Sequence, residues 1–396
     1  MNKLLFLFQN PDVINRRSYN YKMLDGKKEL KFFFSSESTE ELLKRFQENF
    51  AKYIGHDYAF ATGSGFHSLH LIMDYLKPKK NDVSLLQSYI CKQLPAIMSS
   101  YSKIKFVDID SEFNLNFNET LRHSSKAKII HAVHTYGKPF KIKELKEETG
   151  SKDKAIIEDC AHSLGSEYKN KKTGCFGDYS LYSLRKNLPI GYGGVVSSND
   201  KKFADFIEKK KLEPVIQNRD FIGVTALSLR LISDFKRPYM LWDKSAVFSD
   251  KINKELPSRL ALSVLLVQLK NMNKNVNENM DRAGFLSKKF LGQENIVIQK
   301  QRINEKHCYT RFPVRITSNF NIDTAIAELQ KQGFETGFYY GDDFVANMKL
   351  SNESQIHYPE SLKAKNQCIP VGLQGLDKKD LEKLAEMLIS FSGSRQ

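Results

Sequence analysis

Short apolar runs alternate with amphipathic stretches through the first half of the chain. The runs are rich in Val, Ile, Phe and Ala and have the length of strands. They cover residues 58–62, 83–86, 104–109, 127–133, 155–159, 179–184 and 194–197. Helical periodicity between them predicts helices over residues 66–76, 141–148 and 201–211. Strands that alternate with helices indicate an α/β fold, with a mostly parallel sheet covered on both faces.

The second half follows a different pattern. Residues 260–269 are strongly apolar, and neither proline nor strand-like alternation appears through residue 290, which predicts a long helix. The remainder predicts strands over residues 309–316 and 368–371 and helices over residues 322–332 and 378–390. We therefore expect a large domain in residues 1–255, and a linking helix with a smaller α/β domain in residues 256–396.

Composition is that of a globular protein, with an excess of positive charge. The 396 residues include 61 Lys plus Arg against 46 Asp plus Glu, a formal charge of +15. This charge attracts anions, but the lysines lack the aromatic interleaving of a nucleic-acid groove, so nucleic-acid binding is not expected. A basic apolar run at residues 229–237 would suit a membrane surface or a dimer contact, although a packed helix is favoured.

Targeting signals and cysteine usage favour a cytoplasmic protein. The apolar run at the start of the chain is shorter than a secretory signal and lacks a small-residue cleavage site. No stretch is long enough to span a bilayer. The five cysteines are odd in number and scattered, as expected of reduced thiols.

Lys186 and Asp159 suggest cofactor chemistry. Asp159 ends a buried apolar run, which places a carboxylate at the end of a parallel strand, and Lys186 lies shortly before the Gly193–Gly194 pair. A desolvated lysine can form a Schiff base with an aldehyde and can act as a base near neutral pH. A carboxylate can keep a pyridine nitrogen protonated, so together they suggest pyridoxal phosphate. A surface lysine and a helix-capping aspartate are the competing interpretation.

An ordered set of motifs resembles the DegT/StrS family of pyridoxal-phosphate sugar aminotransferases, from about residue 46 to residue 388. The resemblance implies the aspartate aminotransferase fold, which is fold type I, with a seven-stranded sheet in the large domain. The motifs are residues 61–71 (Ala-Thr-Gly-Ser-Gly-Phe-His-Ser-Leu-His-Leu), 106–110 (Phe-Val-Asp-Ile-Asp), 134–137 (His-Thr-Tyr-Gly) and 157–165 (Ile-Glu-Asp-Cys-Ala-His-Ser-Leu-Gly), followed by the Lys186 segment.

The first motif predicts a phosphate site. Ser64, Gly65 and Phe66 lie between a strand and a helix, where backbone N–H groups and the helix N-terminus can hold the cofactor phosphate. Phe66 stands where relatives carry a hydroxyl side chain, so backbone N–H groups must provide more of the phosphate binding. Ser183 resembles the family's phosphate-binding serine if two residues are deleted before Lys186, and Ser180 is the alternative.

Further cofactor contacts follow from the resemblance. His162 takes the place of a glutamine near the cofactor's phenolic oxygen and could donate the same hydrogen bond. The family's stacking aromatic aligns with Cys91, so Tyr89, two residues earlier, is the candidate ring. The asparagine that relatives take from the neighbouring subunit is not recognisable at residues 254–256, although a homodimer with an active site at the subunit interface is still expected.

A metal site is not expected. His67, His70 and Asp74 would share one helix face, but their apolar neighbours indicate a packed helix. His131 and His134, if both lie on one strand, would point to opposite faces and chelate poorly.

Because Lys186 is retained, the resemblance implies transamination and not the dehydration of the family branch that replaces this lysine by histidine. The expected donor is L-glutamate, and the expected acceptor is a nucleotide-linked keto-sugar, for amino-sugar or surface-polysaccharide synthesis. Arg185 and Tyr340 are the candidate substrate contacts. The alternatives are a sugar dehydratase or aldolase on the same fold, a non-catalytic regulatory or binding protein, and a polysaccharide assembly factor at the membrane surface.

Overall fold

A seven-stranded sheet forms the centre of the molecule. The computed structural model describes residues 25–150, 153–190, 193–210, 212, 256–337 and 339–393. Sheet order is β1-β9-β8-β5-β4-β2-β3, with β9 antiparallel to β1 and β8 and the other pairs parallel. The predicted mostly parallel sheet is therefore confirmed. The strands are β1 (Tyr58–Thr62), β2 (Val83–Gln87), β3 (Lys103–Val107), β4 (Ala127–Val133), β5 (Ala155–Asp159), β8 (Tyr179–Ser183) and β9 (Gly194–Ser198).

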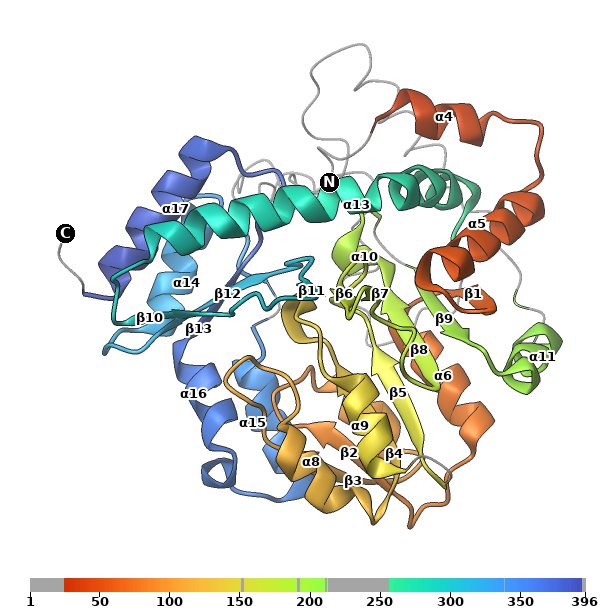
Figure 1. The fold of residues 1–396 in the computed structure, drawn as a ribbon, viewed down its shortest axis with the longest axis horizontal. Coiled ribbons are helices and arrows are strands. Elements are labelled where there is room, and N and C mark those ends of the chain that lie inside the picture. The colour runs from red at the N-terminus through yellow and green to blue at the C-terminus, as the bar shows by residue number, and fades with distance from the viewer. Residues whose placement is uncertain are drawn as a thin grey trace, which may run out of the picture.

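Helices cover both faces of this sheet (Figure 1). Because successive strand residues point to opposite faces, Ile129 and Ile157 pack with Ile72 of α6, while Ile130 and Ile156 pack with Leu145 of α9. The helices before the linking helix are α4 (Lys27–Phe33), α5 (Thr39–Ile54), α6 (Gly65–Leu76), α7 (Gln93–Ser99), α8 (Phe117–Ser124), α9 (Ile142–Thr149), α10 (Leu184–Asn187) and α11 (Lys201–Lys209).

The long helix α13 (Arg259–Lys289) joins the sheet region to a smaller C-terminal unit, and it runs across the upper part of the view, above the central sheet (Figure 1). Leu260 to Val276 belong to the core beneath α5, whereas Leu286 packs with the C-terminal strands. A division before residue 256 stays a prediction, since this helix contributes to both cores.

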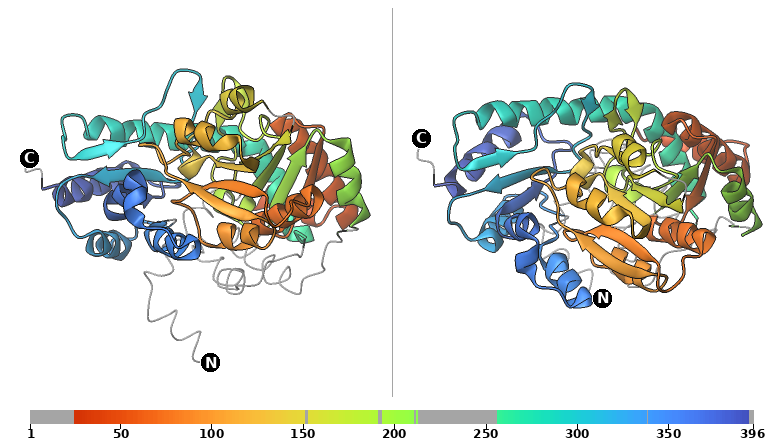
Figure 2. Two further views of the ribbon diagram at one scale, coloured as in Figure 1. Left: turned by 90° about the horizontal axis from the view of Figure 1, so that it is seen from below. Right: turned by 60° about the horizontal axis from the view of Figure 1, so that its bottom comes forward.

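The C-terminal unit is a small α/β layer at one end of the molecule (Figure 2). Its antiparallel sheet has the order β10-β12-β13. A separate small sheet, β11-β6-β7, pairs the C-terminal segment with the large unit. In the small sheet, β6 (Glu167–Tyr168) and β7 (Lys171–Lys172) come from the large unit. The strands and helices after α13 are β10 (Ile296–Ile298), β11 (Glu305–Lys306), β12 (Phe312–Ile316), β13 (Cys368–Val371), α14 (Ile322–Lys331), α15 (Gly341–Ser351), α16 (Pro359–Gln367) and α17 (Lys378–Phe391).

The strand predicted over residues 309–316 begins later than expected. Tyr309 has a φ of 48°, a left-handed conformation that interrupts a strand, and its ring stacks on His307. β12 therefore begins at Phe312. The basic run at residues 229–237 lies outside the described residues, and no helix among those described has an apolar stretch long enough to cross a membrane.

Candidate active site

The predicted site residues meet at the carboxyl end of the central sheet. Asp159 is the last residue of β5 and Ser183 the last of β8, and these two strands are parallel neighbours. Lys186 follows in the short helix α10. In open parallel sheets this edge is where ligands bind, because the loops that leave the strands converge there.

The N-terminus of α6 forms a cradle beside these strand ends. The Ser64 hydroxyl accepts the N–H of His67 and caps the helix, while Gly65 and Phe66 occupy its first turn, where N–H groups have no partner inside the helix. A Cβ at position 194 would lie 2.5 Å from the carbonyl carbon of Ser64. Glycine at position 194 therefore lets β9 approach the backbone of the cradle closely.

Ser183, and not Ser180, borders this cradle. A Cβ at Gly65 would come within 3.2 Å of the Ser183 Cβ. The Ser180 hydroxyl instead lies 2.6 Å from that of Ser197, which is also bonded to His56. Of the two serines predicted for the phosphate, the structure thus places Ser183 beside the helix N-terminus.

His162 connects the nucleophile with its surroundings. The backbone N–H of Tyr136 donates to His162 Nδ1 over 3.1 Å, so the proton of a neutral imidazole is on Nε2. Burial, then the proximity of the basic side chains Lys186, Arg311 and Arg185, holds the pKa of His162 well below its usual range. Nε2 lies 2.9 Å from Lys186 Nζ. Because Nε2 carries a proton, Lys186 can accept it only as a neutral amine.

The electrostatics of Lys186 agree with that neutral state. Burial lowers the pKa of Lys186, the neighbouring Cys91 and Asp159 oppose this, and the guanidinium groups of Arg185 and Arg311 lower it further. A neutral amine is the form that attacks carbonyl carbon and accepts protons. The predicted nucleophile therefore lies in surroundings that activate it.

Tyr340 brings the C-terminal unit into the site. Its hydroxyl lies 2.9 Å from His162 Nε2, and its ring stacks on that of His162 at 6.0 Å between centroids. The Tyr136 ring stacks on His162 from another side, at 5.9 Å. Tyr340, which the sequence suggested as a substrate contact, is therefore placed beside His162, and its contact with substrate stays a prediction.

Tyr89 and Cys91 differ in their placement. Tyr89 is fully buried behind Tyr340, whose N–H donates to its hydroxyl over 3.4 Å. Cys91 is partly exposed, and burial raises the pKa of its thiol to about 11 despite the opposing charge of Lys186. Cys91 thus faces the nucleophile as a neutral thiol, and cofactor stacking on Tyr89 stays a prediction.

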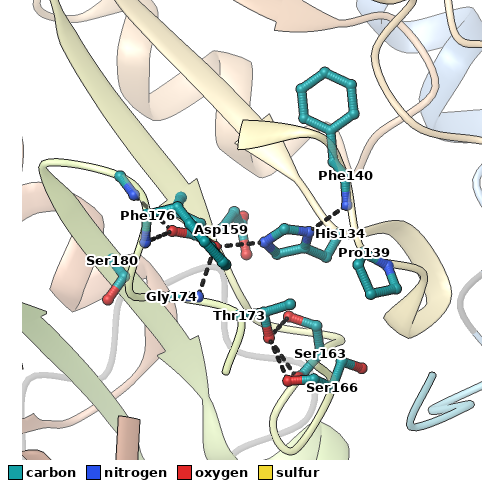
Figure 3. A network of polar contacts seen from close by, with 12 residues as sticks. His134, Pro139, Phe140, Asp159, Ser163, Ser166, Thr173, Gly174, Phe176 and Ser180 are labelled. Atoms are coloured by element: carbon teal, nitrogen blue, oxygen red, sulfur yellow. Dashed lines mark hydrogen bonds and ion pairs between the residues drawn. The ribbon is translucent and has the colours of Figure 1, made fainter. Parts of the chain in front are cut away.

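A buried network supports the strand end from behind (Figure 3). His134 Nδ1 accepts the N–H of Phe140 over 2.8 Å, so Nε2 carries the proton and donates to Glu158 Oε1 over 2.8 Å. Cys160 lies near both, and the three donor atoms are close enough together for a metal ion. Since His134 has no lone pair left and burial raises the pKa of Cys160 well above its usual value, hydrogen bonding explains this cluster.

The other metal candidates are also hydrogen-bonded side chains. The Tyr101 hydroxyl lies 2.9 Å from His70 Nδ1 and donates to Asp74 over 2.7 Å. His67 Nδ1 accepts the N–H of Gly63. These contacts are those of a packed helix.

The residues present fit pyridoxal phosphate. A helix N-terminus with glycine-permitted close approach suits a phosphate, and the nearby Lys186 amine suits an aldehyde. Asp159 is 2% exposed and, within the part of the chain that the structure describes, accepts one backbone N–H, that of Ala161, which leaves acceptor capacity for a ring nitrogen.

Sequence reasoning missed the contribution of the segment around Thr310. The Thr310 hydroxyl approaches the carbonyl of His162 and the amide oxygen of Asn187, both at the site. Arg311 is buried and paired with Glu335, and its charge acts on Lys186 and His162. No periodicity or motif signals these contacts, because they depend on how the C-terminal unit docks.

Known proteins resemble the chain in sequence and in fold. The GDP-perosamine synthase of Escherichia coli O157:H7 is 32% identical over 169 residues, 41% of this chain and 46% of that protein. The chain spans about half the length of the curated relatives it matches.

Two solved structures share the fold. One is a mutant of GDP-4-keto-6-deoxymannose-3-dehydratase with bound GDP-perosamine (TM-score 0.73, 18% identity, 92% of this chain and 98% of that one). The other is the PLP-form of the putative sugar aminotransferase Spr1654 from Streptococcus pneumoniae (TM-score 0.71, 18% identity, 93% and 96%). The fold expected from the motifs is confirmed.

A family model decides the relationship for the whole chain. The model of the DegT/DnrJ/EryC1/StrS aminotransferase family matches residues 36–388, which includes every residue predicted for the site. The chain belongs to this family of pyridoxal-phosphate-dependent sugar aminotransferases.

Proposed function

We propose that this protein binds pyridoxal phosphate and transfers an amino group from an amino acid, L-glutamate, to a nucleotide-linked keto-sugar. The contact between Lys186 Nζ and the protonated Nε2 of His162 carries the proposal, because it requires a neutral lysine amine. A dehydratase that lacks this lysine has no such base. The relatives named as sugar-nucleotide enzymes support the acceptor class.

Different residues would hold the phosphate and the ring of the cofactor. Pyridoxal phosphate supplies an aldehyde that takes up amino groups and a ring that accepts electrons from the adjacent carbon. Ser64, Gly65 and Ser183 would hold the phosphate at the helix N-terminus. Asp159 would hold a proton on the ring nitrogen.

Lys186 and His162 would handle the moving proton. Lys186 Nζ takes a proton from the donor carbon and returns one, since its lowered pKa keeps it available as a base. His162 Nε2–H would donate to the phenolic oxygen or to the lysine nitrogen. Arg185 would supply positive charge for a carboxylate or phosphate of the substrates, whereas Arg311 is paired with Glu335 and acts on Lys186 and His162. Tyr340, beside His162, would contact the substrate.

A cytoplasmic homodimer is part of this proposal. The name of one relative, GDP-perosamine synthase, refers to a nucleotide sugar, and such a substrate supports a cytoplasmic enzyme. Gel filtration with light scattering would test the dimer.

The test is an absorption titration with pyridoxal phosphate, before and after L-glutamate. The unsubstituted protein should develop a visible band that fades with glutamate, and Lys186→Ala should develop none. Lys146→Ala is the control, because Lys146 pairs with Asp178 at the opposite end of the sheet. A band in Lys186→Ala equal to that of the control would refute the proposal, and a glutamate-insensitive band would refute the donor.

A further inference from the structure

His131 breaks the apolar pattern of its strand. On the sheet face where it lies, β4 otherwise presents Ile129 and Val133 to an apolar core that also contains Ile157. His131 is fully buried there. A buried imidazole in such surroundings costs free energy unless a polar partner offsets it.

The polar partner of His131 is Asp159. His131 Nε2 lies 3.3 Å from Asp159 Oδ2, and the two side chains are 0% and 3% exposed. Among the residues that the structure describes, neither ring nitrogen makes a well-aligned hydrogen bond, so the approach of Nε2 to Asp159 is a contact at ion-pair distance. The register explains the contact: His131 pairs with Ile157, and Asp159 lies two residues further along β5 on the same face.

Asp159 needs such a partner more than its neighbour does. The Glu158 carboxylate accepts three backbone N–H groups as well as His134, whereas Asp159 accepts one backbone N–H. Burial raises the pKa of Asp159, the contact with His131 is the largest of the effects that lower it, and the pKa lies below its usual value. Without His131 the carboxylate would lose its nearest offsetting side chain.

We infer that His131 is a positioning residue: through its Nε2 it keeps Asp159 ionised and oriented, so that Asp159 can bind a protonated ring nitrogen. The inference rests on the proposed function, in which Asp159 faces the cofactor ring. It assigns to this chain a histidine–carboxylate pair beneath the cofactor.

Two substitutions separate the chemistry from mere packing. His131→Gln places an amide nitrogen near the position of Nε2, so it keeps the contact with Asp159. His131→Asn places its amide near Nδ1, which does not face Asp159, and it is equally polar. His56→Asn is the matched control, since His56 is also buried but bonds to Ser197 away from the site.

The experiment compares two ligands by their dissociation constants. The probes are pyridoxal phosphate and an analogue in which a C–H group replaces the ring nitrogen, and binding is followed by absorbance and protein fluorescence. His131→Asn should weaken pyridoxal phosphate binding about tenfold or more, the loss of a contact to a charged group. The same variant should bind the analogue within about twofold of the unsubstituted protein, and His131→Gln should recover most of the selective loss.

The two dissociation constants of each variant decide whether His131 acts through Asp159. An equal loss for both ligands would show that His131 only packs, and no loss for either would show that Asp159 does not depend on it. Either result overturns the inference. Asp159→Asn tests the proposed function by itself: if it fails to discriminate between the ligands, Asp159 does not face the ring nitrogen. If Asp159→Asn discriminates between the two ligands and His131→Asn does not, the inference about His131 is wrong and the proposed function stands.

Discussion

Glu158→Gln should release the loop behind the active site. The Glu158 carboxylate accepts hydrogen bonds from His134 and Gly174 on Oε1, and from Phe176 and Gly177 on Oε2. An amide group has only one oxygen. Whichever way the glutamine turns, its NH₂ faces two donors, so two hydrogen bonds are lost and the other two lose their charge.

The magnitude follows from the number of bonds. A hydrogen bond to a buried charged group contributes about 1.5–3 kcal/mol, so losing two costs at least about 3 kcal/mol. If the loop opens locally, that loss accelerates amide exchange roughly a hundredfold, since about 1.4 kcal/mol corresponds to a factor of ten. The effect should be concentrated at Gly174, Phe176 and Gly177.

Hydrogen–deuterium exchange measured by mass spectrometry would detect this opening in a peptide that covers residues 173–178. Glu147→Gln is the control, because Glu147 makes an exposed pair with Lys143 in α9 that contributes well under about 1 kcal/mol. If exchange in the Glu158→Gln loop stays within about threefold of the control, the four bonds do not hold the loop and the reasoning is wrong.

Two other perturbations test the cradle and a buried acid. Gly194→Ala should weaken pyridoxal phosphate binding about tenfold or more, because its Cβ would meet the Ser64 backbone at 2.5–2.6 Å. The control is Gly284→Ala, in open space on α13, which should instead raise stability by about 0.5–1 kcal/mol. A binding titration and thermal melts of both variants would measure the two effects. Burial raises the pKa of Asp110 from 3.8 to about 6, so its contribution to stability is full below about pH 4 and is lost as the pH rises through about 6. Asp110→Asn should therefore gain about 1–2 kcal/mol relative to the unsubstituted protein between about pH 4 and pH 7, and urea midpoints that shift in parallel across this range would contradict the assignment.

Local patterns predicted the frame of this protein well and its contacts only in part. The seven strands, the long helix and the placement of Asp159 and Lys186 follow from apolar runs and from motifs a few residues long. The approach of Tyr340 to His162 does not, because 177 intervening residues and a second unit must fold before the two rings meet. The same holds for Thr310, which lies between β11 and β12 of the later chain and contacts Asn187 of α10.

The Glu158–Asp159 pair shows how one strand separates structural support from chemistry. Consecutive residues of β5 point to opposite faces, and each carboxylate has its own histidine at the end of β4, His134 for one and His131 for the other. Four donors occupy the two oxygens of Glu158, so this carboxylate stabilises the loop and the strand end that it joins. Asp159, the last residue of β5, accepts one backbone N–H and lies near one imidazole, so part of its acceptor capacity stays unused. A buried carboxylate whose acceptor sites are all occupied can only stabilise the fold. One with free acceptor sites stays ionised because nearby polar groups offset its burial, and a cationic ring nitrogen can bind those free sites.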